Sequence, residues 1–184
     1  QGIQVAERAR QLALAYARDR IQSPRADRSS GIEPVAIIGH PDVRRMVLRM
    51  NALTQAARAM LYYASGQLDR ARLGDTQAQV RADLMTPLVK SYGSDIGCEV
   101  AALGVQVHGG MGFIEETGAA QHYRDARIMP IYEGTNGIQA ADLVGRKLVG
   151  DGGAGLEGLL ADIRNDGADI STIAALADAV EEVA

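Results

Sequence analysis

The sequence predicts an all-α protein, an up-and-down four-helix bundle with additional short C-terminal helices. Apolar residues recur at steps of three or four along several long segments, which is the spacing of one helical face. Convincing alternation of apolar and polar residues, the mark of a half-buried strand, is missing. Proline and glycine interrupt the pattern at Ser23-Pro24, at His40-Pro41 and in residues 150–153. These observations predict antiparallel helices joined by loops.

Three long helices are expected before the first glycine cluster. The first covers residues 3–20, and the second begins at His40-Pro41-Asp42 and has a weak break between Gly66 and Gly74. The third ends near His108. Their apolar faces are carried by Val5, Ala9, Leu12 and Tyr16; by Val43, Met46, Val47, Met50, Thr54, Ala57, Leu61 and Ala64; and by Leu84, Leu88, Tyr92, Ile96, Val100, Leu103 and Val107.

The remaining elements are shorter. Residues 35–38 are expected to form a loop that covers the bundle, and residues 117–125 a small helix. A fourth long helix is predicted from about Thr135 to Val149, with Ile138, Leu143 and Leu148 facing inward. Two short amphipathic stretches follow, at about 154–164 and 169–182. We therefore divide the chain into a helical bundle over residues 1–150 and the start of an extra helical region over residues 151–184.

Composition and charge exclude several classes of protein. The 184 residues are 47% apolar and 23% charged, which argues against disorder. A net charge of −4 with scattered basic residues argues against nucleic-acid binding. We expect no membrane span, since no apolar run approaches 18 residues, and no disulfide, since there is one cysteine. The chain opens inside an expected helix without Met, so we interpret it as part of a larger protein.

The glycines cluster where the chemistry is expected. Gln106, Gly109, Gly110 and Gly112 follow one another at the end of the third helix. Glycine-rich backbone presents N–H groups that suit a pyrophosphate. The spacing does not match the dinucleotide fingerprint of a strand–turn–helix unit. A simple glycine cap and turn between helices is the other interpretation, and from these residues alone it is the more frequent one.

Glu133 is the best candidate for acid–base chemistry. It lies in Ile131-Tyr-Glu-Gly-Thr-Asn-Gly137, just before the fourth helix, where Thr135 or Asn136 is a plausible N-cap. A partly desolvated carboxylate there could act as a general base. A solvated glutamate favoured by the helix dipole is the alternative.

Other polar residues are interpreted as structural. His40, His108 and His122 have no ligand partner at helical spacing, so we expect no metal site. Arg124-Asp-Ala-Arg127 could neutralise a phosphate, although a buried ion-pair network is preferred. Cys98 is expected to pack between helices.

Three blocks together resemble the C-terminal helical domain of acyl-CoA dehydrogenases. They are Gln106-Val-His-Gly-Gly-Met-Gly-Phe113, Tyr123-Arg-Asp-Ala-Arg127 and Ile131-Tyr-Glu-Gly-Thr135 with Ile138-Gln139. Their order and spacing agree, and the likeness extends to Gln1 over about 150 residues. The segment Ile-Ile-Gly-His-Pro-Asp-Val-Arg-Arg45 and the Glu-Gly-Thr-Asn-Gly137 variant resemble the branch that includes 3-methylmercaptopropionyl-CoA dehydrogenase. That branch carries an extra C-terminal domain.

The resemblance implies FAD-dependent oxidation of an acyl-CoA thioester to the trans-2-enoyl-CoA. Glu133 matches the base that removes the pro-R α-proton while flavin N5 accepts the β-hydride. Tyr132 and Gly134 are implied at the substrate. For the ADP portion of FAD, the resemblance implies contacts from Arg20, from the Gln106, Gly109 and Gly110 loop across a dimer interface, and from Thr135.

The resemblance also implies partners and departures from the family pattern. It implies acyl-CoA as substrate, electron-transfer flavoprotein as acceptor and a homodimer or homotetramer, in the bacterial cytoplasm or, for a eukaryote, the mitochondrial matrix. Ser23, Gly137 and Pro41 stand where many members carry an aromatic, a Gln or Glu, and a Gln. Two other classes remain open: an acyl-CoA oxidase, and a non-catalytic helical assembly module. Without the middle β-domain, the chain alone is expected to be inactive and to bind FAD weakly.

Overall fold

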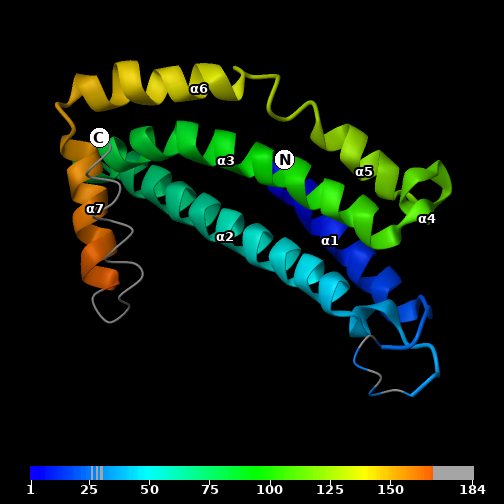
Figure 1. Cartoon of the computed structure of the whole chain (residues 1–184). Coiled ribbons are helices and arrows are strands. Elements are labelled where there is room, and N and C mark those ends of the chain that lie inside the picture. The colour runs from blue at the N-terminus through cyan, green and yellow to red at the C-terminus, as the bar shows by residue number, and fades with distance from the viewer. Residues whose placement is uncertain (26, 28, 30, 168–184) are drawn as a thin grey trace. The chain divides into compact units, whose positions relative to one another are not determined.

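The structure, a computed structural model, describes residues 1–167 except 26, 28 and 30 (Figure 1). The described residues contain seven α-helices, and their only β-type pairing is an isolated bridge between Ile21 and Ala36. The all-α prediction is confirmed. Contacts divide the chain into two compact units: Gln1–Tyr63 with Val89–Asn136, and Ala64–Leu88 with the chain from Gly137 on.

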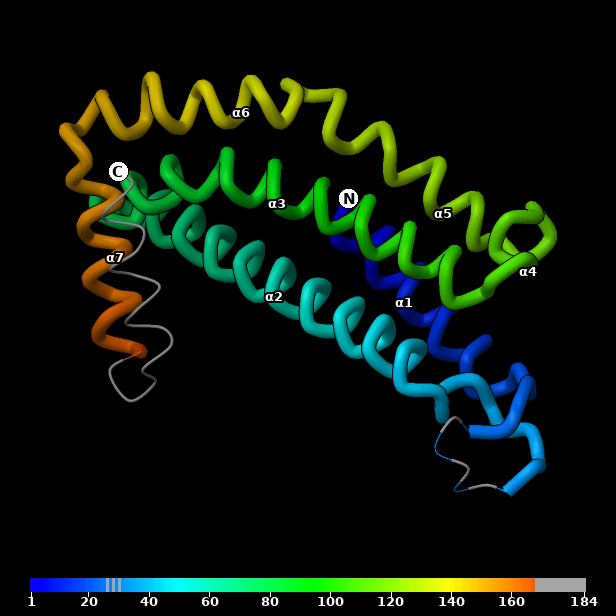
Figure 2. Tube along the Cα trace, in the orientation of Figure 1, coloured from blue at the N-terminus to red at the C-terminus, as the bar shows by residue number. Residues whose placement is uncertain are grey.

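The first unit is built on three helices that pack side by side (Figures 1 and 2). They are α1 (Gly2–Asp19), the first part of α2 (Pro41–Arg72) and the second part of α3 (Thr76–His108). A short helix, α5 (Ala119–Ala126), packs on α1. The buried core joins all four helices and the turn Ile37–Gly39. It consists of Ile3, Ala6, Ala9, Ala13, Ala17, Ile37, Met46, Met50, Ala57, Ile96, Val100, Ala101, Val107 and Ala126.

Small residues set the packing of α1. Ala6, Ala9, Ala13 and Ala17 follow at steps of three or four and are at most 3% exposed. The predicted face of Val5, Leu12 and Tyr16 lies beside this stripe and is only half-buried. The prediction was therefore displaced by about one position, because alanine carries little weight in a hydrophobic pattern yet permits the closest approach of two helices.

The long helices agree with prediction, with small differences at their ends. α2 continues through Gly66 to Arg72, so the predicted break is confined to Leu73–Asp75. α3 passes through Pro87, which is buried, although proline removes one helical hydrogen bond. Ile37 of the predicted covering loop forms a 3₁₀ turn and is buried, as expected for a loop over a core.

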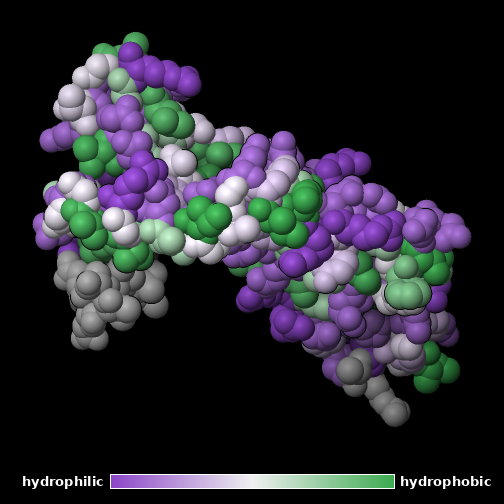
Figure 3. All heavy atoms as spheres, turned by 90° about the horizontal axis from the view of Figure 1, so that it is seen from above, coloured by the Kyte–Doolittle hydropathy of each residue, from purple (hydrophilic) through white to green (hydrophobic). Residues whose placement is uncertain are grey.

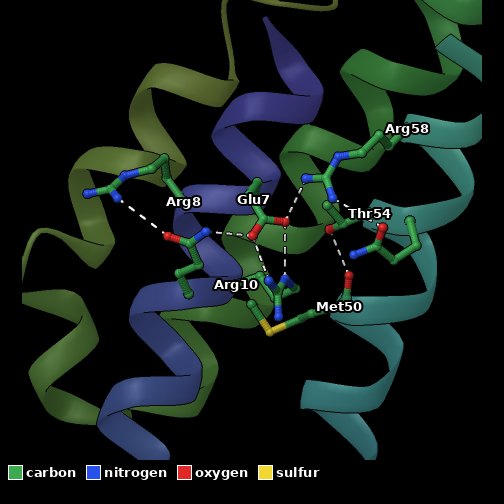
Figure 4. A network of polar contacts seen from close by, with 8 residues as sticks. Glu7, Arg8, Arg10, Met50, Thr54 and Arg58 are labelled. Carbon is green, nitrogen blue, oxygen red and sulfur yellow. Dashed lines mark hydrogen bonds and ion pairs between the residues drawn. The ribbon is translucent and has the colours of Figure 1, made fainter. Parts of the chain in front are cut away.

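A carboxylate with three polar partners joins α1 to α2 (Figure 4). Glu7 accepts hydrogen bonds from Arg10 Nη2 at 2.6 Å, from Arg58 Nη2 at 2.8 Å and from Gln11 Nε2 at 2.6 Å. These bonds, the one from Arg10 above all, lower the pKa of Glu7 to about 2. The ionised form of Glu7 therefore stabilises the folded first unit.

The second unit is held by polar contacts as well as by a small core. It contains the end of α2, the start of α3, α6 (Asn136–Asp142) from Gly137 on, a π-helical segment Leu143–Leu148, and α7 (Ala154–Asp166). Arg81 pairs with Asp162 at 2.8 Å, and Lys147 with Asp83 at 3.4 Å. Buried residues of this unit include Ala78, Ala82, Leu84, Met85 and Leu160.

The prediction for the 135–149 segment was wrong in one respect. The segment is helical, but Ile138, expected to face inward, is 60% exposed. Exposed apolar side chains elsewhere on the surface are scattered among polar ones, as the face in Figure 3 illustrates. The residues Ile138, Leu143 and Leu148 follow at steps of five, and each step turns about 140° around an α-helix, so they do not share one face.

The structure describes part of the C-terminal region predicted from the sequence. The predicted stretch at 154–164 is α7, and the stretch at 169–182 lies outside the described residues. The division at residue 150 remains a prediction. Among the described helices, none is long and apolar enough to cross a bilayer.

Candidate functional site

A hollow of about 250 Å³ lies beside Glu133 in the first unit. Its apolar wall includes Ile3 of α1, Leu61 of α2 and Val89 of α3, and its polar wall includes Lys90 and Ser94 of α3. Glu133 and Tyr132 border it from the loop between α5 and α6. A pocket with an apolar side and a few convergent polar groups is the usual form of a small-molecule site.

Glu133 has an uncommon backbone conformation. Its φ angle is +55°, and the following Gly134 has φ of +82°. A non-glycine residue in the left-handed region is uncommon and costs of order 1–3 kcal/mol, so it persists only where surrounding contacts hold it. Such residues gather at functional sites. Glu133 in this conformation lines the hollow, and the residue is exposed.

The neighbours of Glu133 occupy different environments. Tyr132 is half-buried, and its hydroxyl donates to Met129 Sδ at 3.0 Å. Gly134 is half-buried and Thr135 is exposed. Asn136 is the first residue of α6, so Thr135 stands at the predicted N-cap position. Thr135 does not line the second hollow, where the other residues predicted at the ADP portion lie.

The second hollow brings together residues that are far apart in the sequence. Arg20, Gln106, Gly109 and Gly110, all predicted at the ADP portion of FAD, line one cavity of about 410 Å³. Arg20 stands directly after α1, where its Nη2 donates to Gln22 Oε1 at 3.3 Å. The other three come from the end of α3 and the start of the short α4 (Gly110–Phe113).

The glycine loop at this hollow serves both as a turn and as an open surface. Gly109 ends α3 with φ of +60° and ψ of −138°, a conformation that essentially requires glycine. A Cβ atom at Gly109 or Gly110 would meet nothing within 4 Å, so both backbones face open space. The cap-and-turn interpretation and the ligand interpretation of this loop are therefore compatible.

His108 supports the wall of this hollow. It is 4% exposed, its Nδ1 donates to the carbonyl oxygen of Gly104 at 2.7 Å, and its ring stacks on Tyr16 at 4.3 Å. The ring thus fastens the end of α3 to α1 next to Arg20. The prediction that His108 is a structural residue with satisfied hydrogen bonds is confirmed.

The two hollows lie near opposite ends of α1. The Glu133 hollow includes Gly2 and Ile3, whereas the Arg20 hollow includes Tyr16 and Arg20. With a rise of 1.5 Å per residue, these positions are roughly 20 Å apart along the helix. The first unit therefore presents two separate candidate sites.

Two further polar predictions have different outcomes. Arg124 pairs with Glu115 at 3.3 Å on the surface, where the two side chains are 48% and 82% exposed, so the expected burial of this network was wrong. Cys98 packs between helices and donates to Ala126 O at 3.3 Å. Within the described part of the chain, no cluster of three His, Cys, Asp or Glu side chains has the geometry to hold a metal ion.

Sequence reasoning missed the α3 residues that surround the loop of Glu133. Lys90 and Ser94 line the hollow, and both contact Asn136, which was considered only as a helix cap. Their four-residue spacing puts them on one helical face, and this was the only sequence signal for their association.

Comparison with known proteins agrees with the three sequence blocks. The family model "Acyl-CoA dehydrogenase, C-terminal domain" matches residues 1–148. The chain is 59% identical over 157 residues to 3-methylmercaptopropionyl-CoA dehydrogenase of Ruegeria pomeroyi, covering 83% of the chain and 26% of that protein. It is 38% identical over 156 residues to a butyryl-CoA dehydrogenase of Syntrophomonas wolfei, covering 82% and 25%.

A solved structure has a similar fold. The butyryl-CoA dehydrogenase of Megasphaera elsdenii superposes with a TM-score of 0.64 at 28% identity, covering 78% of this chain and 33% of that one. The chain spans about a quarter of the length of the two curated relatives named above. On the family match and these identities, the chain belongs to the acyl-CoA dehydrogenase family, to whose C-terminal domain it corresponds.

Proposed function

We propose that this chain is the C-terminal, base-bearing part of an FAD-dependent acyl-CoA dehydrogenase. In this proposal the full-length protein oxidises an acyl-CoA thioester to the trans-2-enoyl-CoA in the cytoplasm of a bacterium. The supporting observation is the left-handed Glu133, held at the border of an apolar hollow in the Tyr-Glu-Gly-Thr segment that the family resemblance assigns to the base. A helical assembly module without a catalytic role would have no use for this costly conformation at Glu133.

Glu133 has the chemistry that proton removal next to a thioester requires. A carboxylate accepts a proton, and a bound acyl chain that excludes water strengthens the electrostatic interactions around it. The apolar wall formed by Ile3, Leu61 and Val89 is suited to an acyl group. In the proposal the Tyr132 and Gly134 backbone borders the thioester, and a backbone N–H near Glu133 polarises its oxygen as charge develops.

The residues at the second hollow fit the ADP portion of FAD. The Arg20 guanidinium pairs well with a pyrophosphate, the Gln106 amide can bond to an adenosine, and Gly109 and Gly110 leave open space for close backbone approach. When bound, the flavin supplies the acceptor for the hydride from the β-carbon. Thr135 lies in the loop of Glu133, and we assign it to the cofactor on that side.

The family resemblance supports an oligomer. Because it implies that the glycine loop meets the ADP portion across a dimer interface, we propose that the Glu133 hollow and the Arg20 hollow serve two different FAD molecules. The Arg20 set of one chain would then contact the cofactor of a second chain. This arrangement requires a homodimer, or a homotetramer made of two dimers, and analytical ultracentrifugation of the full-length protein checks it.

The reaction and its electron acceptor are tested together. The FAD-loaded, full-length protein is mixed anaerobically with 3-methylmercaptopropionyl-CoA or butyryl-CoA, and flavin absorbance is followed. The proposal expects bleaching and a product lighter by two hydrogens by mass spectrometry. Reoxidation by electron-transfer flavoprotein but slowly by oxygen identifies a dehydrogenase, whereas fast reoxidation by oxygen identifies an oxidase. Absence of bleaching with every acyl-CoA contradicts the proposal.

The predicted division of the chain at residue 150 leads to a separate expectation about FAD binding and activity. If residues 1–150 form the family bundle and residues 151–184 begin an extra region, the chain lacks the domain expected to hold most of the flavin ring. The 184-residue chain alone is then inactive and binds FAD weakly. A stoichiometric yellow complex of the purified chain with FAD would overturn this expectation.

A further inference from the structure

The side chain of Asn136 joins the loop of Glu133 to α3. Its Oδ1 accepts hydrogen bonds from Lys90 Nζ at 2.9 Å and from Ser94 Oγ at 3.0 Å. Its Nδ2 donates to Asp95 Oδ1 at 2.7 Å and to the carbonyl oxygen of Ser91 at 3.3 Å. All four partners lie within six residues on one side of α3.

Only a primary amide satisfies these partners. Lys90 can only donate and ionised Asp95 can only accept, so they fix which end of the amide faces which partner. The amide uses both acceptor positions and both N–H donors. Bonds to charged partners are also stronger than bonds between neutral groups. A carboxylate of the same shape would keep the two acceptor contacts, lose both donors and face Asp95 with like charge.

The same residue closes the loop that contains Glu133. The backbone N–H of Asn136 donates to Pro130 O at 3.1 Å, and Tyr132 N donates to Ile128 O at 3.1 Å. Glu133 and Gly134, with their consecutive positive φ angles, lie inside this closed segment. A glutamate with a left-handed backbone conformation returns to a more favourable one unless surrounding contacts hold it. Asn136 supplies such a hold three residues further along the chain.

Two hydrogen-bond partners of Asn136 line the same hollow as Glu133. Lys90 and Ser94, which donate to Asn136, line the cavity together with Glu133. These hydrogen bonds therefore attach the loop of Glu133 directly to the wall of the hollow against which a substrate would rest. A shift of the loop along α3 would move the carboxylate relative to that wall.

We propose that Asn136 is a positioning residue for the base, holding Glu133 in its left-handed conformation through the four bonds to α3. The proposal rests on the proposed role of Glu133 in proton removal. Asn136 does not touch the reacting atoms in this account; it acts on Glu133 through the loop. Misplacement of a catalytic group by about 1 Å can cost about 100-fold in rate.

The test uses the full-length, FAD-loaded protein and an isosteric change. Asn136→Asp keeps the side-chain shape and removes both donors to α3. The double variant Asn136→Asp with Asp95→Asn exchanges the amide and the carboxylate of this pair. The amide at position 95 can then donate to the carboxylate at position 136, and the net charge is restored. Asn51→Asp, an exposed residue on α2, makes the same chemical change away from the site. The two main quantities are the rate of flavin reduction in a single turnover and the amide hydrogen exchange of residues 130–136. Substrate dissociation constant, FAD content and exchange in α1 are measured as controls.

The expected result separates positioning from folding. Asn136→Asp lowers the reduction rate about 100-fold and speeds exchange in residues 130–136 about tenfold. Substrate dissociation constant, FAD content and exchange in α1 stay as in the unmodified protein. The double variant recovers most of both losses, and Asn51→Asp changes neither quantity.

Three results overturn the proposal. The first is an Asn136→Asp rate within about threefold of the unmodified protein. The second is unchanged exchange in residues 130–136, and the third is a double variant that recovers neither quantity. An unmodified protein that no acyl-CoA reduces overturns the proposed function and the catalytic part of this proposal together. That outcome is distinguishable, because in the other three the unmodified protein is reduced normally.

Discussion

Gly97 of α3 lies so close to Gly2 of α1 that a Cβ atom at Gly97 would be 2.9 Å from the Gly2 carbonyl oxygen and 3.1 Å from its Cα. The neighbouring Gly93 is in similarly close backbone contact with Gly2. The two helices therefore meet backbone to backbone at the end of α1 that borders the Glu133 hollow. Two glycines of this crossing, Gly2 and Gly93, line that hollow.

Gly97→Ala should destabilise the chain. The added methyl group meets backbone atoms, which cannot turn away as a flexible side chain can, so the cost is about 1–3 kcal/mol. Gly66→Ala is the matched control: it lies in α2 with nothing within 4 Å of an added Cβ, and it should stabilise by about 0.5–1 kcal/mol. Urea unfolding followed by circular dichroism measures both. Equal effects of the two substitutions would contradict the close crossing.

The Glu7 network should give the stability of the chain a dependence on acid. The pKa of Glu7 is lowered to about 2 from 4.5, so its stabilising contribution is present above pH 4.5 and is lost as pH falls toward 2. We expect about 1–2 kcal/mol, allowing for screening by solvent. Glu7→Gln should remove it at pH 7, because Arg10 and Arg58 then lose their shared partner.

Unfolding at pH 7 and at pH 2.5 measures this contribution. The difference between the unmodified chain and Glu7→Gln should be largest at pH 7 and should shrink at pH 2.5. Glu116→Gln, an exposed glutamate of the first unit, is the control and should differ little at either pH. A Glu7→Gln difference that stays constant between the two values would show that the ionised carboxylate does not carry the effect.

Arg20→Ala should weaken FAD binding by the full-length protein. Hydrogen bonds to a charged group contribute about 1.5–3 kcal/mol, which corresponds to about 10- to 100-fold in the dissociation constant. Arg18→Ala is the control, since Arg18 is exposed near the end of α1, two residues before Arg20, and does not line the hollow. Titration of the apoprotein with FAD measures both constants. Equal constants for the two variants would remove Arg20 from the cofactor site.

The two glycines at this hollow should respond differently to alanine. Gly109→Ala should destabilise the fold by about 1–3 kcal/mol, since its φ of +60° is strained for any side chain. Gly110→Ala should leave stability unchanged, because its methyl group enters open space. In the full-length protein it should instead weaken FAD binding, about tenfold for a loss of 1.4 kcal/mol. Normal FAD affinity of Gly110→Ala would contradict a close approach of cofactor to this backbone.

The helices were largely predictable because periodicity is a local property of the sequence. The faces of α2 and α3 follow from the spacing of residues such as Met46, Met50, Ile96 and Val100, all of which are buried. The deepest stripe of α1 was placed less well, since it consists of alanines. Ile138 was misplaced because the steps of five from Ile138 to Leu143 and on to Leu148 do not follow one helical face.

The candidate site was predictable in its residues but not in its geometry. The family resemblance singled out Glu133, Arg20 and the glycine loop, and only the fold shows that Arg20 and Gly109 border one hollow. The contacts of Asn136 reach residues more than 40 positions earlier. Such contacts depend on how helices are placed in space, which no local pattern in the sequence encodes.

The most direct test of the central claim is the single-turnover reduction of FAD by an acyl-CoA in the full-length Glu133→Gln variant. Glutamine keeps the size of the side chain and cannot accept the α-proton. The account predicts that Glu133→Gln binds FAD and acyl-CoA normally but reduces the flavin at least 1,000-fold more slowly, toward the upper range for loss of a general base, while Glu116→Gln reduces it at the unmodified rate. Rapid flavin bleaching by Glu133→Gln would contradict the assignment of Glu133 as the base.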